Sequence, residues 1–498
     1  MVFALDMPLP ETSVELQAFL KTFVGRLVAL EQENSALRAE NAALREELTV
    51  LKARNQRLET EVVALRHRLG LNSQNSHKPP SSDGLQKKPA FPRVKGEKKP
   101  GGQTGHPGKT LARVAVPDVV VVHGPLTCTC CGKSLQGAPI EQTLGERQVF
   151  DMPAPKLRVT AHQVGVVTCC GLAQKGAFPA TVAAPVQYGP LLQALMVTLC
   201  VDYRLPAKKT GQLIADLFGY GLNESTILTT SQGVATALVP VETAIKANLL
   251  ASPVVHFDET GMRVAGQRTW FHTASTASWT YLFCHPKRGR VALQSEASVL
   301  ADFRNWAIHD CYATYFTFTD CQHGLCGAHL VRELTACQER GSQWAPRMKD
   351  LLLTLHKKVK QGFDLRPERP KWEAIFQQIA AEADAEEPPP AAADGPKKRG
   401  KTAQSKGRNL LDRLLKYQAS VLAFAFTPDV PFTNNQAERD IRCVKIKQKV
   451  AMSFRTFEGA NGYARIQGFV SSVRKNGHNV LQQLLRVIQG DTLDWVAT

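Results

Sequence analysis

The chain has 498 residues, of which 43% are hydrophobic and 21% charged, a composition that excludes a wholly disordered chain. Its 61 Lys and Arg against 44 Asp and Glu leave a net charge of +17, which favours a polyanionic partner, most commonly nucleic acid. No apolar run has the length of a membrane span, and the N-terminus lacks the pattern of a secretory signal. We therefore expect several domains, no membrane partner and a cytoplasmic protein whose 12 cysteines are thiols or metal ligands.

Residues 1–70 are predicted to form a coiled-coil dimerisation helix. Large apolar side chains recur every seventh residue from Phe23 to Leu65, and asparagine stands at three of the intervening core positions. Leucine at d and a buried asparagine at a favour two strands in a fixed register. The side chains expected to pair two or more copies are Leu30, Asn34, Leu37, Asn41, Leu44, Leu51, Asn55, Leu58 and Leu65. The alternative is one amphipathic helix packed on its own domain, but the repeat is longer than a globular core normally covers.

Residues 71–113 are predicted to be a basic, flexible linker, since Pro, Gly, Ser and Lys dominate the segment. Such a composition offers little apolar surface to bury, so no packed core is expected there. Two interpretations stand: the linker follows the phosphate backbone of DNA, or it only separates and solubilises the domains.

Residues 114–185 are predicted to form a small zinc-ribbon-like β module, in which strand-like runs alternate with two cysteine groups. Cys128 and Cys131 have the C-x-x-C spacing of a zinc knuckle, and Cys169 and Cys170 form a second pair about forty residues later. Together the four thiols predict one zinc site. Because adjacent cysteines rarely both ligate one ion, ligation by three thiols, or a module held by its strands alone, remains an alternative.

Residues 186–250 are predicted to be helical, with a helix-turn-helix-like pair of helices. The first helix of the pair spans 206–218, a glycine-containing turn follows, and Asn223 caps the second helix. Lys208 and Lys209 open the first helix and are expected to contact DNA. The alternative is a helical hairpin packed in the core, without a role in binding.

Residues 251–325 are predicted to form the first part of a catalytic core. The sequence PVVHFDET is a buried-strand pattern that ends in Asp258, a costly position for a carboxylate without a partner. The elements that follow are two strand-like runs, a helix-like stretch and a second apolar run, at 268–276, 278–285, 297–306 and 307–310. The last run ends in Asp310. Acids in the first and fourth strands of this order are the plan of the ribonuclease-H-like fold.

A third acid is expected from a helix that packs beside these strands. Glu438 is the candidate, because Asn434 or Asn435 would cap a helix that has Glu438 in its first turns. Three carboxylates hold two Mg²⁺ ions, which activate the attacking oxygen and stabilise the leaving oxygen in phosphodiester cleavage. Asp320 and Glu259 are the nearest rivals for these positions.

Between the second and third acids, residues 326–430 are predicted to be a helical insertion with a disordered basic loop, and residues 431–498 complete the core with helices and a tail. The segment CQHGLCGAH, at 321–329, carries several metal-capable side chains. We interpret it as a strand running into a helix, with His329 in a structural or phosphate-binding role rather than at a metal site. The basic side chains expected to contact DNA near the acids are Arg332, Arg439, Arg442, Lys445 and Lys447.

These motifs together resemble the DDE transposases of the insertion-sequence 66 group. The segments that carry the resemblance span nearly the whole chain and read NSQNSHKPPSSDG, GGQTGHPGK, CTCCG, HFDET, HDCYATYF, LCGAHLVREL and NNQAERDIR. The resemblance implies that Asp258, Asp310 and Glu438 are the catalytic acids and Mg²⁺ ligands, and it selects Asp310 over Asp320. In two places the chain departs from the family pattern: Cys311 stands where a glycine is usual, and the second cysteine pair is compressed.

The resemblance further implies a multidomain protein with a ribonuclease-H-like core that acts as the transposase of a bacterial insertion sequence. Such an enzyme binds the terminal inverted repeats of its element and uses Mg²⁺ or Mn²⁺ to cleave and transfer DNA strands. Expected partners are element and target DNA, a second copy of the chain and accessory proteins encoded by the same element, all in the cytoplasm at the nucleoid. The alternatives are a non-catalytic or decayed DNA-binding dimer and a nuclease without strand transfer.

Overall fold

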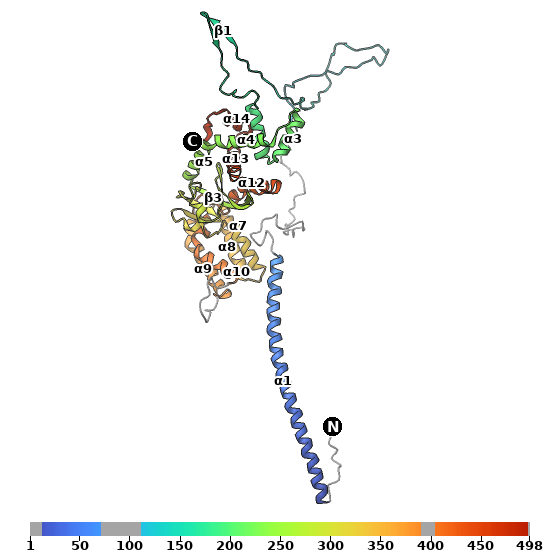
Figure 1. Cartoon of the computed structure of the whole chain (residues 1–498), viewed down its shortest axis with the longest axis vertical. Helices are drawn as coiled ribbons and strands as arrows, with labels where there is room; N and C mark the ends of the chain where they lie inside the picture. The colour runs from blue at the N-terminus through green and yellow to red at the C-terminus, as the bar shows by residue number, and fades with distance from the viewer. Residues whose placement is uncertain (1–11, 71–110, 390–403, 497–498) are drawn as a thin grey trace. The chain divides into compact units, whose positions relative to one another are not determined.

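The computed structural model describes residues 12–70, 111–389 and 404–496 (Figure 1). The chain divides into two compact units, Met1–Gln86 and Lys87–Thr498. Most of the predicted basic linker, and the basic loop of the predicted insertion, lie outside the described residues.

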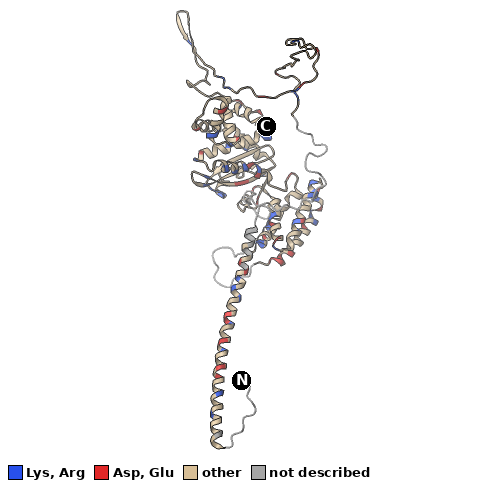
Figure 2. Cartoon of the chain, turned by 90° about the vertical axis from the view of Figure 1, so that its right-hand side faces the viewer, with Lys and Arg blue, Asp and Glu red and all other residues tan. Residues whose placement is uncertain are grey.

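In the first unit, the described residues form one long helix, α1 (Ser13–Gly70), as the heptad repeat predicts. The leucines of the repeat are about half exposed, for example Leu44 at 55% and Leu51 at 52%. Basic and acidic residues are distributed along the helix around them (Figure 2). A row of half-exposed leucines on a charged helix is the surface that a second such helix would bury, and the pairing itself stays a prediction.

The cysteine-bearing segment is mostly irregular, with one hairpin among its described residues, β1 (Val166–Cys169) paired antiparallel with β2 (Leu172–Lys175). Cys170 and Gly171 form its turn, with φ of 53° and 73°. The other strand-like runs remain largely unpaired, and their valines stay exposed, as at Val120 with 73% exposure. Short strands need cross-strand neighbours or a metal crosslink to hold a core, so the predicted ribbon is reduced here to a hairpin.

The second unit continues with helices α2 (Pro190–Val197), η2 (Thr198–Asp202, a π-helical turn), α3 (Ala207–Phe218), α4 (Glu224–Ala237) and α5 (Val239–Ala251). The predicted pair of helices is present as α3 and α4, and the side chain of Asn223 caps α4 by accepting from the Ser225 N–H at 3.1 Å. Gly211, inside α3, packs against the turn that follows the helix. A Cβ at this position would be 2.5 Å from the carbonyl oxygen of Leu222, so only glycine fits.

Among the described residues, no single helix is long and apolar enough to cross a membrane. The pair α4 and α5 passes the same test of length and composition only when taken together, and it is bent by 50°.

A five-stranded mixed sheet forms the centre of the second unit, in the order β5-β4-β3-β6-β7. Its strands are β3 (Val254–Val264), β4 (Gln267–Ser275), β5 (Thr280–His285), β6 (Trp306–His309) and β7 (Gln322–Leu325). β3, β4 and β5 form the antiparallel meander that the sequence predicts, and β6 and β7 add parallel strands on the other side of β3.

Two local predictions in this region are wrong. The stretch 297–306 is not a helix but a series of turns that reaches into β6, and the short helix α6 (Arg290–Leu293) precedes it. The Ser298 hydroxyl accepts the N–H of Leu300 at 3.2 Å, a local bond that competes with helix formation. In addition, β3 does not end at Asp258 but continues to Val264 because β4 pairs with it along that whole length.

Helices cover the sheet and form two neighbouring cores. The helices are α7 (Gly327–Gln338), α8 (Trp344–Lys360), α9 (Arg369–Glu386), α10 (Lys406–Lys416), α11 (Gln418–Phe426), α12 (Asn435–Ala451), α13 (Phe457–Lys475) and α14 (Val480–Gln489), with single turns η3 (Tyr315–Thr317), η4 (Arg366–Glu368) and η5 (Asp494–Val496). α12 and α13 pack on the meander, whereas α7 to α11 enclose a second core beside β6 and β7. Within the predicted helical insertion, a break at Tyr417 separates α10 from α11.

Candidate active site

Parallel pairing of β3 with β6 places the two predicted aspartates beside each other. The ladder joins Val254 to Trp306 and His256 to Ile308, residues that are 52 apart in sequence (306 − 254). Asp258 and Asp310 are also 52 apart (310 − 258), so the same register continued by two residues sets them side by side. Both follow the last ladder pair, at the edge where the parallel strands end.

The charges that act on Asp258 include both of the other predicted acids. Burial raises the pKa of Asp258 well above its usual range, and the negative charges of Glu259, Asp310 and Glu438 raise it further. The Glu259 N–H, which donates to Asp258 Oδ1 at 2.8 Å, opposes this shift but does not reverse it. Clustered carboxylates with only this much compensation form a site that favours a hard cation with oxygen ligands, such as Mg²⁺.

α12 brings Glu438 to this edge, and Asn434 fixes the start of the helix. Asn434 is 1% exposed, and its side chain donates to the carbonyl of Phe257 at 2.7 Å. Its Oδ1 lies 2.9 Å from His256 Nδ1, and its backbone N–H donates to Cys326 Sγ at 3.2 Å. Asn434 is therefore at the N-cap position, as predicted, but its side chain binds β3 instead of capping α12. Sequence reasoning missed this role because the partners are distant in the chain.

Replacement of Asn434 by alanine is expected to lower the free energy of unfolding by about 1–3 kcal/mol, because it leaves the Phe257 carbonyl buried without its donor. Urea denaturation of the full chain measures the effect. Asn409→Ala is the matched control: Asn409 is exposed on α10, and its loss is expected to cost no more than about 0.5 kcal/mol. Equal losses in the two variants would contradict the anchoring role of Asn434.

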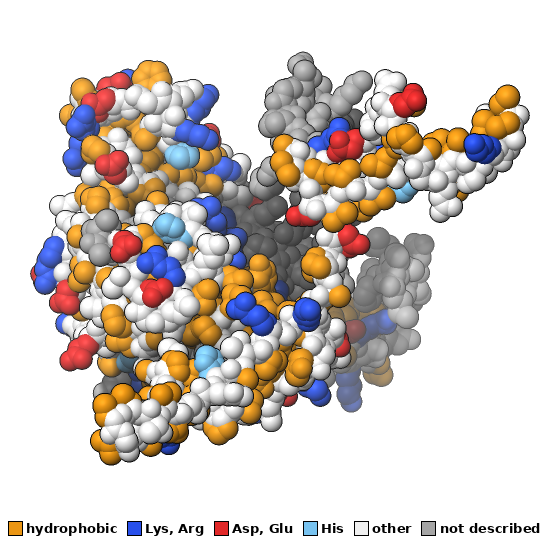
Figure 3. Space-filling model, turned by 90° about the horizontal axis from the view of Figure 1, so that it is seen from above, with side chains coloured by type: hydrophobic (Ala, Val, Ile, Leu, Met, Phe, Trp, Pro, Cys, Tyr) orange, Lys and Arg blue, Asp and Glu red, His pale blue; other side chains and the backbone are white. Residues whose placement is uncertain are grey.

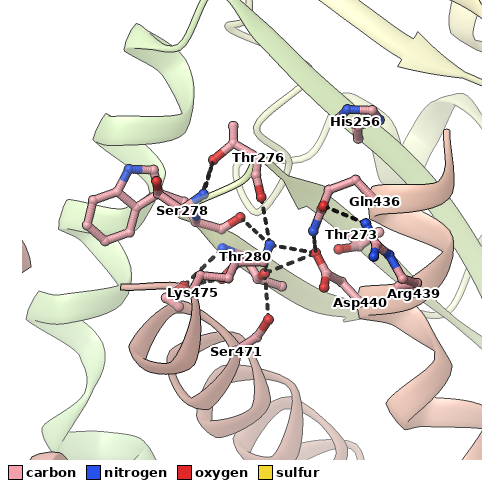
Figure 4. A network of polar contacts seen from close by, with 12 residues as sticks. His256, Thr273, Thr276, Ser278, Thr280, Gln436, Arg439, Asp440, Ser471 and Lys475 are labelled. Atoms are coloured by element: carbon pink, nitrogen blue, oxygen red, sulfur yellow. Dashed lines mark hydrogen bonds and ion pairs between the residues drawn. The ribbon is translucent and has the colours of Figure 1, made fainter. Parts of the chain in front are cut away.

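A buried ion pair holds α12 against α13 and β5 (Figure 4). Lys475 Nζ lies 2.6 Å from Asp440 Oδ2, and the two side chains are only 12% and 11% exposed. Lys475 also donates to the carbonyls of Thr276 and Trp279 at 2.7 and 3.1 Å, and Thr280 Oγ1 donates to the same Asp440 oxygen at 3.2 Å. Asp440 is two residues after Glu438, so this network fixes the helix segment that carries the third acid.

The rival acids have other partners. Glu259 is enclosed by Arg288, whose Nε donates at 2.9 Å, and by the hydroxyl of Tyr315. Asp320 lies before β7 with its side chain 67% exposed, where it forms an ion pair with Arg304 at 3.5 Å. The geometry thus groups Asp258 with Asp310 and Glu438 rather than with Asp320, and it places Glu259 in the wall beside them.

His329 lies directly beside the third acid, which the sequence did not predict. Its Nδ1 is 3.7 Å from Glu438 Oε1, and Cys326 Sγ belongs to the same group, whose ligand atoms all lie within 4.8 Å of one another. Metal binding is therefore an alternative to the structural or phosphate-binding role that the sequence predicts for His329. The C-x-x-H spacing of Cys326 and His329 was a signal for this arrangement.

Most of the basic side chains predicted to contact DNA are exposed. Arg439, Arg442 and Lys445 are exposed on α12, and Lys445 Nζ donates to the Gly261 carbonyl of β3 at 2.6 Å. On α12 the exception is Lys447, whose Nζ lies 5.8 Å from the centre of the Tyr463 ring and whose pKa is lowered by burial. Lys447 is therefore a poorer candidate for DNA contact than predicted.

The remaining basic candidates stand on other helices. Lys208 and Lys209 are exposed on α3, and half-buried Arg332 donates to the Ala328 carbonyl on α7 at 3.2 Å. In the surface view, basic side chains are spread among apolar ones (Figure 3). DNA contact by these residues stays a prediction.

The four cysteines of the predicted zinc site stay in two pairs. Gly132, with φ of 73°, closes a knuckle in which its N–H donates to the Cys128 carbonyl at 3.0 Å, and hydrogen bonds from Cys131 and Cys130 lower the pKa of the Cys128 thiol. Cys169 and Cys170 have their sulfurs 3.7 Å apart at the hairpin turn. None of these thiols belongs to a metal-capable group of three or more among the described residues, so zinc binding here stays a prediction.

Comparison with known families decides the class of the protein. Residues 185–462, more than half of the chain, match the model of the transposase IS66 family. The chain belongs to this family. The match includes all three predicted acids, and membership in the transposase IS66 family makes DNA the expected partner. Residues 29–112 also match a family of unknown function (DUF6444), and a search among curated proteins found no match.

Proposed function

We propose that the protein is the transposase of a bacterial insertion sequence, which cleaves DNA at the terminal inverted repeats of its element and joins the freed end to target DNA. The adjacency of Asp258 and Asp310 that the β3–β6 register implies, together with the charge of Glu438 that acts on Asp258, carries this proposal. Its family membership supports the same reaction class. The sheet order β5-β4-β3-β6-β7, with an antiparallel meander beside two parallel strands, supports the ribonuclease-H-like core that we propose, with a DDE site on these three residues.

Asp258, Asp310 and Glu438 would hold two Mg²⁺ or Mn²⁺ ions, because they are oxygen donors whose mutual repulsion a cation relieves. Metal ions held by these residues would supply activation of the attacking water or 3′-hydroxyl and stabilisation of the leaving oxygen. The chain itself positions the acids: the β3–β6 register sets the two aspartates, and Asn434 together with the Asp440–Lys475 pair sets Glu438. Exposed Arg439 and Arg442 on α12 would neutralise phosphates of the bound strand.

The rest of the chain would deliver DNA to this site. We propose that α1 pairs protomers into a dimer or higher assembly, and that the cysteine-bearing segment and the α3–α4 pair grip the element ends. Zinc at Cys128, Cys131, Cys169 and Cys170 would require the two thiol pairs to meet. Accessory proteins encoded by the same element are further expected partners, and the reaction would take place in the cytoplasm at the nucleoid.

The test is a strand-transfer assay on the full chain. DNA carrying the inverted repeats that flank the gene, labelled near the 3′ end, is incubated with a target plasmid and Mg²⁺. A transposase yields cleaved ends and labelled plasmid. Cleaved ends without joined product would assign a nuclease, and band shifts without any Mg²⁺-dependent cleavage would assign a non-catalytic DNA-binding dimer.

The role of α1 gives a separate prediction. Leu37→Asp combined with Leu44→Asp is expected to shift the full chain from dimer or higher species to monomer, because charged side chains at d positions cannot be buried in a helix pair. Sedimentation or light scattering measures the mass. Glu46→Gln with Thr49→Ala, at outward-facing positions of the same helix, should leave the mass unchanged. A monomeric parent chain at micromolar concentration would contradict the coiled-coil assignment.

A further inference from the structure

A thiol, an imidazole and a carboxylate meet where α7 and α12 begin. Cys326 follows the last residue of β7, His329 lies in the first turn of α7, and Glu438 lies in the first turn of α12. One ligand atom from each lies within 4.8 Å of the other two. Among the described residues, these three form the one set of three or more such side chains whose ligand atoms all lie within 4.8 Å of one another; Asp258, Asp310 and Glu438 are more widely spaced than this limit.

Backbone contacts hold the two helix starts together. The Gly327 N–H donates to the Phe432 carbonyl at 2.8 Å, and the Asn434 N–H donates to Cys326 Sγ at 3.2 Å. Gly327 has no room for a side chain, since a Cβ there would lie 2.2 Å from the Phe432 ring. The three ligands are therefore set on rigid elements, which is the condition for a preorganised site.

The donor set is not one that suits Mg²⁺. Mg²⁺ takes oxygen ligands, whereas a thiolate with an imidazole and a carboxylate suits zinc and similar ions. Three protein ligands leave a fourth tetrahedral position open. Glu438 Oε1 is buried and accepts no hydrogen bond from the described residues, so a cation bound to this oxygen would replace no donor.

We propose that Cys326, His329 and Glu438 bind a divalent cation of the zinc class, at a site that shares Glu438 with the oxygen site of Asp258 and Asp310. Occupation of this site inhibits DNA cleavage, because Glu438 is then held toward the thiol and the imidazole instead of the Mg²⁺ ions. The binding site stands on geometry alone, whereas the inhibition rests on the proposed function.

Cobalt spectroscopy tests the binding site without any activity assay. The full chain is prepared with Cys128, Cys131, Cys169 and Cys170 replaced by serine, so that the predicted zinc-ribbon thiols do not contribute, and is titrated with Co²⁺. We expect one equivalent of Co²⁺ to give a thiolate-to-cobalt charge-transfer band, which Zn²⁺ then displaces. Absence of the band from this four-serine chain, when thermal melting shows it to be folded, would overturn the proposal.

Two further variants assign the band. Cys326→Ser should abolish it, because serine keeps an acceptor for the Asn434 N–H but supplies no thiolate. Cys337→Ser, a buried cysteine on the same helix, should retain it. His329→Gln should weaken Co²⁺ binding about 10-fold or more. A band that survives Cys326→Ser, with thermal melting showing a folded chain, would place the metal elsewhere and overturn the assignment.

A cleavage assay then tests inhibition. At fixed Mg²⁺, Zn²⁺ is added to the unmodified chain, here called the parent, and to the same chain carrying only Cys326→Ser. Each cleavage rate is divided by the rate of the same protein without Zn²⁺. We expect the parent to lose cleavage as the site fills, and Cys326→Ser to need at least about 10-fold more Zn²⁺. Equal sensitivity would overturn the inhibition. If the cobalt band is present but the unmodified chain never cleaves DNA in Mg²⁺, the proposed function is refuted and the metal site stands.

Discussion

Asp258→Asn is expected to abolish metal-dependent strand cleavage while binding of the element ends is retained. Asparagine keeps the shape of the side chain but removes one of the three charges that would hold the ions. Loss of about 4 kcal/mol of transition-state stabilisation corresponds to a fall of about 10³-fold in the cleavage rate. Gel-shift and cleavage assays on the same DNA separate the two effects, and cleavage at the normal rate would refute the assignment of Asp258.

The same variant is expected to be more stable than the parent chain in the absence of metal. Burial and the neighbouring acids raise the folded-state pKa of Asp258 above its unfolded value, so its ionised form opposes folding. The parent should therefore lose stability as pH rises from the ordinary range of an aspartate through the raised pKa, and Asp258→Asn should lack this component. Thermal melting in EDTA across pH measures it. Asp320→Asn, at an exposed ion pair, is the control and should behave like the parent.

Asp440→Ala is expected to cause the largest loss of stability among the variants considered. The change leaves Lys475 buried without its counter-charge, and breaking a buried pair in this way costs about 3–5 kcal/mol. Chemical denaturation followed by circular dichroism gives the shift in midpoint. Because the network lies next to Glu438, Mg²⁺-dependent cleavage should also fall in the fraction of the chain that remains folded.

Two comparisons make the Asp440 result specific. Asp364→Ala breaks an ion pair with Arg366 whose side chains are more than half exposed, and it should leave the denaturation midpoint nearly unchanged. Replacement of both buried partners, as Asp440→Asn with Lys475→Met, should recover most of the loss because no charge is then left unpaired. If Asp440→Ala and Asp364→Ala destabilise the chain equally, the buried network does not hold α12.

The parts of the site that lie within single strands could be predicted from the sequence. The apolar runs before Asp258 and Asp310 have the local pattern of buried strands, and each run forms one. The two aspartates are 52 residues apart (310 − 258), and so are the residues that pair between β3 and β6 (306 − 254). Only the strand register shows that this equality sets the aspartates side by side. The cap of α4 by Asn223 was predictable for the same reason, since donor and acceptor are two residues apart.

The parts that depend on contacts between distant residues could not be predicted. Asn434 has the pattern of a helix cap, but its side chain is drawn to β3, where two partners lie at 177 and 178 residues' separation. The stretch 297–306 has helical composition, yet its buried Ser298 and the packing of Phe303 in the core favour turns. The sequence predicts Lys447 to be an exposed cation, but in the fold its amino group packs against the ring of Tyr463.

The contact between Cys326 and Asn434 also bears on how this family can change over time. The two residues are 108 positions apart, yet they are hydrogen-bonded, so the chain between them begins and ends at neighbouring points. The loops within that segment can therefore change in length while Asp310 and Glu438 keep their separation. Relatives could lengthen or trim these loops, and thereby acquire new binding surfaces, without a compensating change at either acid.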